Sequence, residues 1–148
     1  MKKLVLDSSV VVKWLPMFWR EPLVNEALEL HRKWDAGEIE ISVPEFFWLE
    51  VTAILWKANR RGNCTAVQAE MAFQSLLGLK IPTVESGPLL QATLGIATRH
   101  ARSVYDCLYV ALAYSQQAEF ITADEKLVNA VSGRLPVKWV GSFFPEAC

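Results

Sequence analysis

The sequence predicts an α/β domain built on a parallel sheet, and two observations support this fold class. Near the start, an unbroken apolar run of branched residues, 4–6, ends abruptly at Asp7 and two serines. Such a run is typical of a strand that is buried on both faces, as the central strands of parallel sheets are. The rest of the chain alternates between segments of helical periodicity and short strand-like runs.

Length and composition fit one ordinary globular domain over residues 1–148. Hydrophobic residues make up 52% of the chain and charged residues 21%, which excludes a disordered protein. The net charge of −1 does not mark a nucleic-acid binder, so any such role depends on local basic patches.

The sequence also predicts a cytoplasmic location without a membrane anchor. No stretch approaches the ~18 uncharged apolar residues of a membrane span, and Asp7 interrupts the first apolar run too early for a signal peptide. The three cysteines, Cys64, Cys107 and Cys148, are odd in number and widely separated. This spacing predicts reduced thiols, not a disulfide framework or a zinc site.

The segment after the first strand is expected to form a helix, a connection, a second helix and a strand. A serine cap and a following proline predict a short helix over residues 8–15. The aromatic-rich connection over residues 17–22 is interpreted as a loop packed on its own core, with an exposed patch for a partner protein as the alternative. Apolar residues at helical spacing predict a helix over residues 22–34, and alternating charges predict a strand over residues 38–43.

The middle of the chain is expected to be mainly helical. A wide apolar stripe predicts a long helix over residues 45–60. Thr65 is a cap for a further helix that reaches residue 77. A third short strand is predicted over residues 79–84, and a Gly-Pro pair then opens a helix over residues 89–100.

The last part contains the predicted buried helix and two more strands. Ser103 with Asp106 resembles the first half of a capping box, which predicts a helix cap at Ser103. The helix that follows, to residue 113, is small or apolar on nearly every side, which predicts burial. Residues 119–122 form a predicted strand that ends in Thr122, and Thr122 with Glu125 matches a capping box for a helix that reaches residue 131. A final strand is predicted over residues 136–140.

Four acidic residues stand at positions that need an explanation. Asp7 and Asp124 follow the first and fourth predicted strands, and ligands of α/β sheets bind beyond the carboxyl ends of strands. Asp106 opens the predicted buried helix, and Glu50 lies in the apolar belt of a helix. Taken singly, each acid could be a helix cap, a partner of the helix dipole or half of a salt bridge.

If these acids converge, they require a cation. Two carboxylates ~4 Å apart repel by about 4 kcal/mol at an effective dielectric constant of 20. Hard oxygen ligands without histidine or cysteine favour Mg²⁺ or Mn²⁺. Such a cluster commonly activates water against a phosphodiester.

Four motifs give the chain a resemblance to a known family. They are V-L-D-S-S-V-V-V-K-W at residues 5–14, P-E-x-x-x-x-E-V at 44–51, Y-D-C-L-Y-V-A-L-A at 105–113 and I-T-A-D-E-K-L at 121–127. In this order they resemble the PIN domain, specifically the VapC type of bacterial and archaeal toxin–antitoxin families. The resemblance covers residues 3–143 and implies a single PIN-like domain, with helices on both faces of a parallel sheet, that forms a homodimer.

The resemblance also implies an activity and its residues. Asp7, Glu50, Asp106 and Asp124 would be the catalytic acids that bind Mg²⁺ or Mn²⁺ and cleave RNA, and a cognate antitoxin would hold the enzyme inactive. Lys126 stands where some members carry a further acid, which argues against a fully occupied second metal site. The candidate substrate-binding residues are Ser9, Arg99, Arg102 and Thr122.

The predicted function is therefore a metal-dependent endoribonuclease, the toxin of a toxin–antitoxin pair. A phosphatase of the haloacid-dehalogenase kind also begins with a strand that ends in Asp, but it needs an acid where Ser9 stands. A PIN nuclease of RNA processing and a non-catalytic nucleic-acid-binding module with the same fold are the remaining alternatives.

Overall fold

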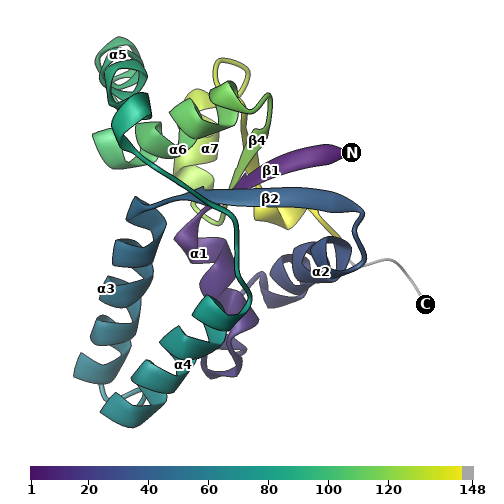
Figure 1. The fold of residues 1–148 in the computed structure, drawn as a ribbon, viewed down its shortest axis with the longest axis vertical. Coiled ribbons are helices and arrows are strands. Elements are labelled where there is room, and N and C mark those ends of the chain that lie inside the picture. The colour runs from purple at the N-terminus through teal and green to yellow at the C-terminus, as the bar shows by residue number, and fades with distance from the viewer. Residues whose placement is uncertain (145–148) are drawn as a thin grey trace.

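The computed structural model describes residues 1–144 and contains one parallel sheet with the strand order β3-β2-β1-β4-β5 (Figure 1). All four strand pairs are parallel, which confirms the predicted α/β class. The strands are β1 Lys2–Leu6, β2 Ile39–Pro44, β3 Thr83–Val84, β4 Glu119–Thr122 and β5 Val137–Trp139. The first strand of the chain is therefore the central strand, as its apolar run predicts.

Helices cover both faces of this sheet, with α6 and α7 on one side and α1 and α2 on the other (Figure 1). The helices of the described residues are α1 Ser8–Val11, α2 Val24–Asp35, α3 Phe46–Arg60, α4 Ala66–Gly78, α5 Leu90–His100, α6 Val104–Ser115 and α7 Glu125–Val131. Four short 3₁₀ turns, η1 Val12–Trp14, η2 Pro16–Phe18, η3 Gly87–Leu89 and η4 Val140–Ser142, join them. In the part of the chain that the structure describes, no helix is long and apolar enough to cross a membrane.

The core lies where α6 packs against the centre of the sheet. Residues 107–113 of α6 are all buried, as predicted, and the helix contacts β1, β2 and β4. Leu4, Val5 and Leu6 of β1 are at most 1% exposed. In contrast, α3 and α4 form a hairpin that extends away from the sheet (Figure 1).

The register of the sheet brings the carboxyl ends of β1 and β4 together. Leu6 pairs with Ile121, and the backbone N–H of Asp7 donates to the carbonyl of Ile121 at 2.9 Å. The residues that follow these two strands, Asp7 and Ala123, are therefore close neighbours although they are far apart in the sequence.

Two of the predicted helix caps are confirmed, and two are wrong. Thr65 and Gln68 form a complete capping box at the start of α4, and Ser103 accepts the N–H of Asp106 at the start of α6. At α7, however, the cap is Asp124, which accepts the N–H of Leu127. At α1, the N-cap position is occupied by Asp7 and no side chain forms a cap hydrogen bond.

Those two caps differ because the hydroxyl groups have other partners. The hydroxyls of Ser9 and Thr122 donate to the carboxylate of Asp7, and Ser8 Oγ lies 3.4 Å from one oxygen of Asp7 and 3.4 Å from one oxygen of Glu50. A helix cap requires the hydroxyl oxygen to accept a backbone N–H from the first turn of its own helix, and the oxygens of Ser9 and Thr122 accept outside that turn.

The aromatic-rich connection over residues 17–22 is mostly a loop on its own core. Met17 and Phe18 pack against the hydrophobic core, which confirms the interpretation for these two residues, whereas Trp19 is 53% exposed. Lys13 is buried, and its ammonium group forms an ion pair with Glu21 at 2.9 Å. This ion pair connects the end of the loop to the body of the protein.

The three cysteines were predicted to be reduced. Cys64 and Cys107 are free thiols, and Cys148 lies outside the described residues. The predicted domain over residues 1–148 also includes residues 145–147, which lie outside the described residues as well.

Replacing Gly141 by Ala is expected to destabilise the protein by roughly 1–3 kcal/mol, because overpacking of a filled site costs about this much. A Cβ atom at Gly141 would lie 2.5 Å from the ring of Trp139, closer than Cβ atoms approach other atoms in proteins, so the ring or the backbone would have to shift. The measurement is urea unfolding. The matched control is Gly95→Ala in α5, where a Cβ meets nothing within 4 Å and a gain of roughly 0.5–1 kcal/mol is expected. Equal unfolding midpoints for Gly141→Ala and the wild type would contradict the prediction.

Candidate active site

The candidate site lies at the carboxyl edge of the sheet, where β1 and β4 end and where α3 and α6 begin. Asp7 follows β1, and Asp124 lies two residues beyond β4. Asp106 is in the first turn of α6, and Glu50 is one turn into α3. The four acids therefore come from four different elements that meet at one edge, which is where ligands of open α/β sheets bind.

Three hydroxyl groups hold the carboxylate of Asp7. Ser9 Oγ and Thr122 Oγ1 each donate to Oδ2 at 2.8 Å, and Ser8 Oγ lies 3.4 Å from Oδ1. Burial raises the pKa of Asp7 above its ordinary value, the hydroxyl groups oppose this shift, and the charge of Asp106 adds to it. The Asp7 carboxylate is thus fixed in position while its negative charge remains poorly compensated.

The same hydroxyl groups connect Asp7 to the backbone around Asp124. Ser9 Oγ accepts the N–H of Ala123 at 3.2 Å, and Thr122 Oγ1 accepts the N–H of Asp124 at 3.1 Å. Each hydroxyl therefore donates to one acid and accepts from the segment that carries another. Ser9 and Thr122, predicted to bind substrate, lie in the site and organise it.

Glu50 lies against the buried side of the site. Its Oε1 accepts a hydrogen bond from the hydroxyl of Tyr109 and lies 3.4 Å from Ser8 Oγ. Burial, followed by the charges of Asp7 and Asp106, raises the pKa of Glu50 to about 7, although the Tyr109 hydrogen bond opposes the shift. Burial also holds the pKa of the Tyr109 phenol well above its usual range, so this hydroxyl remains a donor.

Asp106 and Asp124 complete the set. Burial raises the pKa of Asp106, the charge of Asp124 raises it further, and the nearby Arg102 lowers it. Asp124 itself is exposed, and one of its oxygens, Oδ1, caps α7. Each of the four acids is thus coupled by its charge to at least one of the others.

The salt-bridge explanation of Glu50 does not hold for the described residues, since none of the four acids forms an ion pair there. Across residues 1–144, the acids do not already form a group of three at the spacing of metal ligands. Because all donors are oxygen atoms and no cationic side chain is paired with them, the donor set fits Mg²⁺ or Mn²⁺.

The two candidate arginines differ in their relation to the acids. Arg102 is half-buried, its charge acts on Asp106, and its Nε is buried without a hydrogen-bond partner in the described chain. Arg99 is exposed in the last turn of α5. Among the described residues, no hydrogen bond or ion pair links Arg99 to the acids.

Sequence reasoning missed two residues of the site, Ser8 and Tyr109. Ser8 was considered only as a helix cap. Tyr109 carried a usable signal, because a phenol in an otherwise apolar, buried helix needs a hydrogen-bond partner, and it follows Asp106 by three residues.

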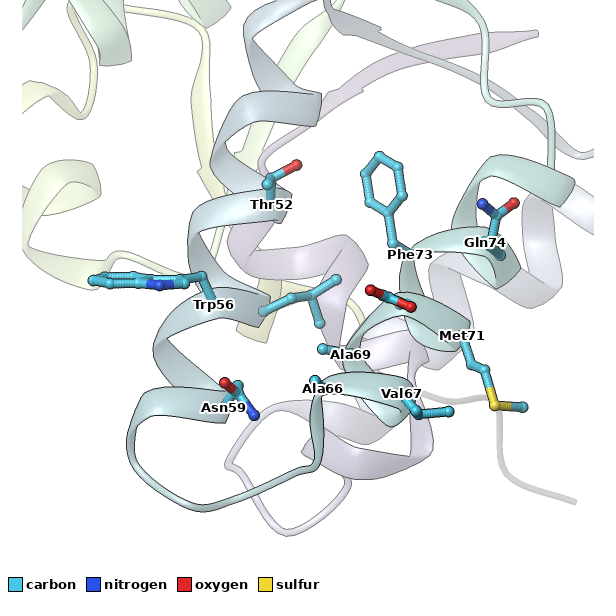
Figure 2. A pocket seen from close by; sticks show the side chains of 11 residues that line it. Thr52, Trp56, Asn59, Ala66, Val67, Ala69, Met71, Phe73 and Gln74 are labelled. Carbon is cyan, nitrogen blue, oxygen red and sulfur yellow. The ribbon is translucent and has the colours of Figure 1, made fainter.

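An apolar groove between α3 and α4 is a different surface (Figure 2). It has a volume of about 710 Å³, and Trp56, Val67 and Met71 on its walls are each more than half exposed. None of the four acids lines it. Its apolar character suits a protein partner better than a charged substrate.

Fold and site together define a class: parallel α/β domains with an all-oxygen acidic centre at the carboxyl edge of the central strands. The sequence model of the PIN domain matches residues 4–132. This chain belongs to the PIN domain family, whose members are nucleases that use divalent metal ions. A comparison with curated protein sequences found no match.

Several solved structures share the fold. The crystal structure of PAE2754 from Pyrobaculum aerophilum has a TM-score of 0.66 and 22% identity, covering 96% of this chain and 85% of that chain. VapBC2 from Rickettsia felis, bound to a DNA fragment from their promoter, has a TM-score of 0.63 and 13% identity, with coverage of 93% and 98%. A toxin-antitoxin complex from Klebsiella pneumoniae has a TM-score of 0.58 and 13% identity, with coverage of 91% and 95%. At these identities the similarity concerns the fold.

Proposed function

We propose that this protein is a Mg²⁺- or Mn²⁺-dependent endoribonuclease and the toxin of a toxin–antitoxin pair. The observation that carries the proposal is the placement of four carboxylates at the carboxyl edge of a PIN fold, coupled to one another by their charges and none in an ion pair within the described chain. The structural similarity to toxin–antitoxin complexes supports the assignment to such a pair.

In the proposed centre, Asp7 and Asp106 would hold the cation, with Asp124 and Glu50 as the further oxygen ligands, directly or through water. When bound, the cation supplies Lewis-acid chemistry that polarises a phosphodiester and makes water more acidic. The residues of the chain provide the geometry. Ser9 and Thr122 hold the Asp7 carboxylate in place, and Arg102, whose positive charge acts on Asp106, would attract an RNA phosphate.

A stacked aromatic pair beside the acids supports a single-stranded substrate. Phe46 lies one turn before Glu50 on α3, and Tyr105 directly precedes Asp106. Their ring centroids are 5.0 Å apart with an angle of 20° between the planes, and Tyr105 is 58% exposed. Unpaired bases stack on exposed aromatic rings of this kind.

The partner proposed for inhibition is a cognate antitoxin. The exposed apolar walls of the α3–α4 groove and the exposed ring of Trp19 support a protein partner. The homodimer and the cytoplasmic location remain predictions from the sequence.

The test of the proposal is cleavage of single-stranded RNA by the purified protein. We expect cleavage with Mg²⁺ or Mn²⁺, none in EDTA, and recovery when the metal is restored. RNA binding without cleavage under all metal conditions would instead favour the non-catalytic binding module. Cleavage that continues in EDTA would contradict a metal-dependent mechanism.

Substitution of Arg102 by Glu is expected to weaken the binding of single-stranded RNA and to reduce the slope of log Kd against log salt by about one, because fewer counterions are released. Fluorescence anisotropy in EDTA measures both quantities without cleavage. Lys57→Glu is the matched control, because Lys57 is exposed near the far end of α3. Equal losses in the two variants would remove Arg102 from the proposed RNA site.

A further inference from the structure

Tyr109 occupies a position in the core that phenylalanine would fill equally well, apart from its hydroxyl group. The side chain is 1% exposed, and its ring stacks on Phe120 of β4 with centroids 4.8 Å apart and 14° between the planes. Its neighbours on α6 from Cys107 to Ala113 are buried and otherwise apolar or weakly polar. A hydroxyl group in such surroundings lowers stability unless it has a hydrogen-bond partner.

The partner of this hydroxyl is a single oxygen of Glu50. The Tyr109 O–H donates to Oε1, and Ser8 Oγ lies 3.4 Å from the same atom and 3.4 Å from Asp7 Oδ1. Within residues 1–144, no hydrogen bond reaches the other oxygen, Oε2. The two oxygens of Glu50 therefore have different roles: Oε1 is anchored, and Oε2 is available.

We propose that Tyr109 is a positioning residue for the acidic centre: its hydroxyl anchors Oε1 of Glu50, with help from Ser8, so that Oε2 alone faces the cation or its water. This inference rests on the proposed function. Tyr109 acts through Glu50 and does not touch the substrate.

The anchor matters because Glu50 is a flexible ligand. A glutamate side chain loses up to ~2 kcal/mol of rotamer entropy when it is held in one conformation. A hydrogen bond from a residue that is itself fixed by stacking supplies this order before the cation binds. Residues that orient metal ligands typically change metal affinity about 10- to 100-fold when they are mutated.

The direct test is Tyr109→Phe, which keeps the ring, its burial and its stacking on Phe120. We expect the Kd for Mn²⁺, measured by isothermal titration calorimetry, to rise about tenfold. In RNA cleavage at saturating Mn²⁺, we expect kcat to fall more than KM changes. Tyr114→Phe, on the same helix but 52% exposed, is the matched control and should change neither quantity.

A double-mutant cycle distinguishes anchoring of Glu50 from a general effect on the core. In a Glu50→Gln background, Tyr109→Phe should cause little further loss of Mn²⁺ affinity, because residues that act through one contact are not additive. Ser8→Ala should give a smaller effect of the same kind. Thermal melting of each metal-free variant checks that the fold is intact.

The outcomes separate this inference from the proposed function. If Glu50→Gln leaves Mn²⁺ binding unchanged, Glu50 is not part of a metal centre, and the four-acid assignment fails together with the role of Tyr109. If Glu50→Gln weakens binding but Tyr109→Phe does not, or if the two losses add fully, the positioning role is overturned while the metal centre stands.

Discussion

Replacing Asp106 by Asn is expected to remove measurable Mn²⁺ binding and to lower RNA cleavage by about 10³-fold or more, as loss of an essential catalytic group typically does. The substitution keeps the size of the side chain and leaves the α6 cap intact, because Ser103 accepts from the backbone N–H of residue 106. What it removes is one negative charge from a group of acids whose charges already act on each other.

Calorimetric titration with Mn²⁺ and a gel assay of RNA cleavage measure the two effects. Asp35→Asn is the matched control, because it makes the same chemical change at an exposed position in the last turn of α2. A variant with Asn at position 106 that bound Mn²⁺ like the wild type would show that Asp106 is a capping-region residue and not a metal ligand.

The second large effect concerns stability without metal: Asp7→Asn is expected to raise the melting temperature at pH 8 in EDTA by about 2–5 °C, equivalent to roughly 1 kcal/mol in a domain of this size. Burial and the charge of Asp106 raise the pKa of Asp7 above its ordinary value of 3.8. The folded state therefore binds a proton more tightly than the unfolded state, and ionisation of Asp7 destabilises the fold.

Because the pKa of Asp7 is raised, the stability difference between the wild type and Asp7→Asn depends on pH. Below pH 3.8 the carboxyl group is protonated in both states and Asp7 contributes no penalty. As the pH rises through the raised pKa, the folded protein loses stability, and a neutral Asn avoids this loss. The Asn oxygen can still accept from Ser9 and Thr122, which both donate to one oxygen of Asp7.

Glu50 should show the same behaviour in a defined window. Its pKa is raised from 4.5 to about 7, so the metal-free wild type should lose stability between these two pH values and Glu50→Gln should flatten the curve. Thermal melts in EDTA from pH 4 to pH 8 measure the Asp7→Asn and Glu50→Gln variants.

A melting temperature of Asp7→Asn below that of the wild type at pH 8 would indicate that Asp7 stabilises the metal-free fold. Added Mn²⁺ should stabilise the wild type more than either variant.

The elements with strong local signals were predicted well. The apolar run of β1, the all-round apolar α6 and the caps at Thr65 and Ser103 are set by neighbouring residues, and each was confirmed. The strand predicted over residues 79–84 is reduced to Thr83–Val84. Leu79 instead ends α4, and Lys80 has a φ of 55°, a left-handed conformation that no regular strand accommodates.

The interactions within the site depend on contacts that no local pattern contains. Thr122 and Glu125 match a capping box, yet the Thr122 hydroxyl bonds Asp7, 115 residues away in the sequence. The sequence indicated that acids stand at strand ends, but only the parallel pairing of β1 with β4 shows that Ser9 and Thr122 share one acceptor. The partner of Glu50 was also hidden, because a salt bridge and a phenol are equally compatible with a carboxylate in an apolar helix.

The pairing of β1 with β4 has a consequence for synthesis on the ribosome. The hydrogen bond between Asp7 and Thr122 spans 115 residues, which take roughly 6–23 s to translate at about 5–20 residues per second. A chain that ends just before β4 already contains Asp7, Glu50 and Asp106 but lacks β4 and Asp124. A truncated product that stops before Glu119 leaves one edge of the central strand unpaired, and such an edge is prone to aggregation. Chains that stop before Glu119 therefore lack Asp124, and the proposed four-acid centre can form only after β4 and Asp124 have been made.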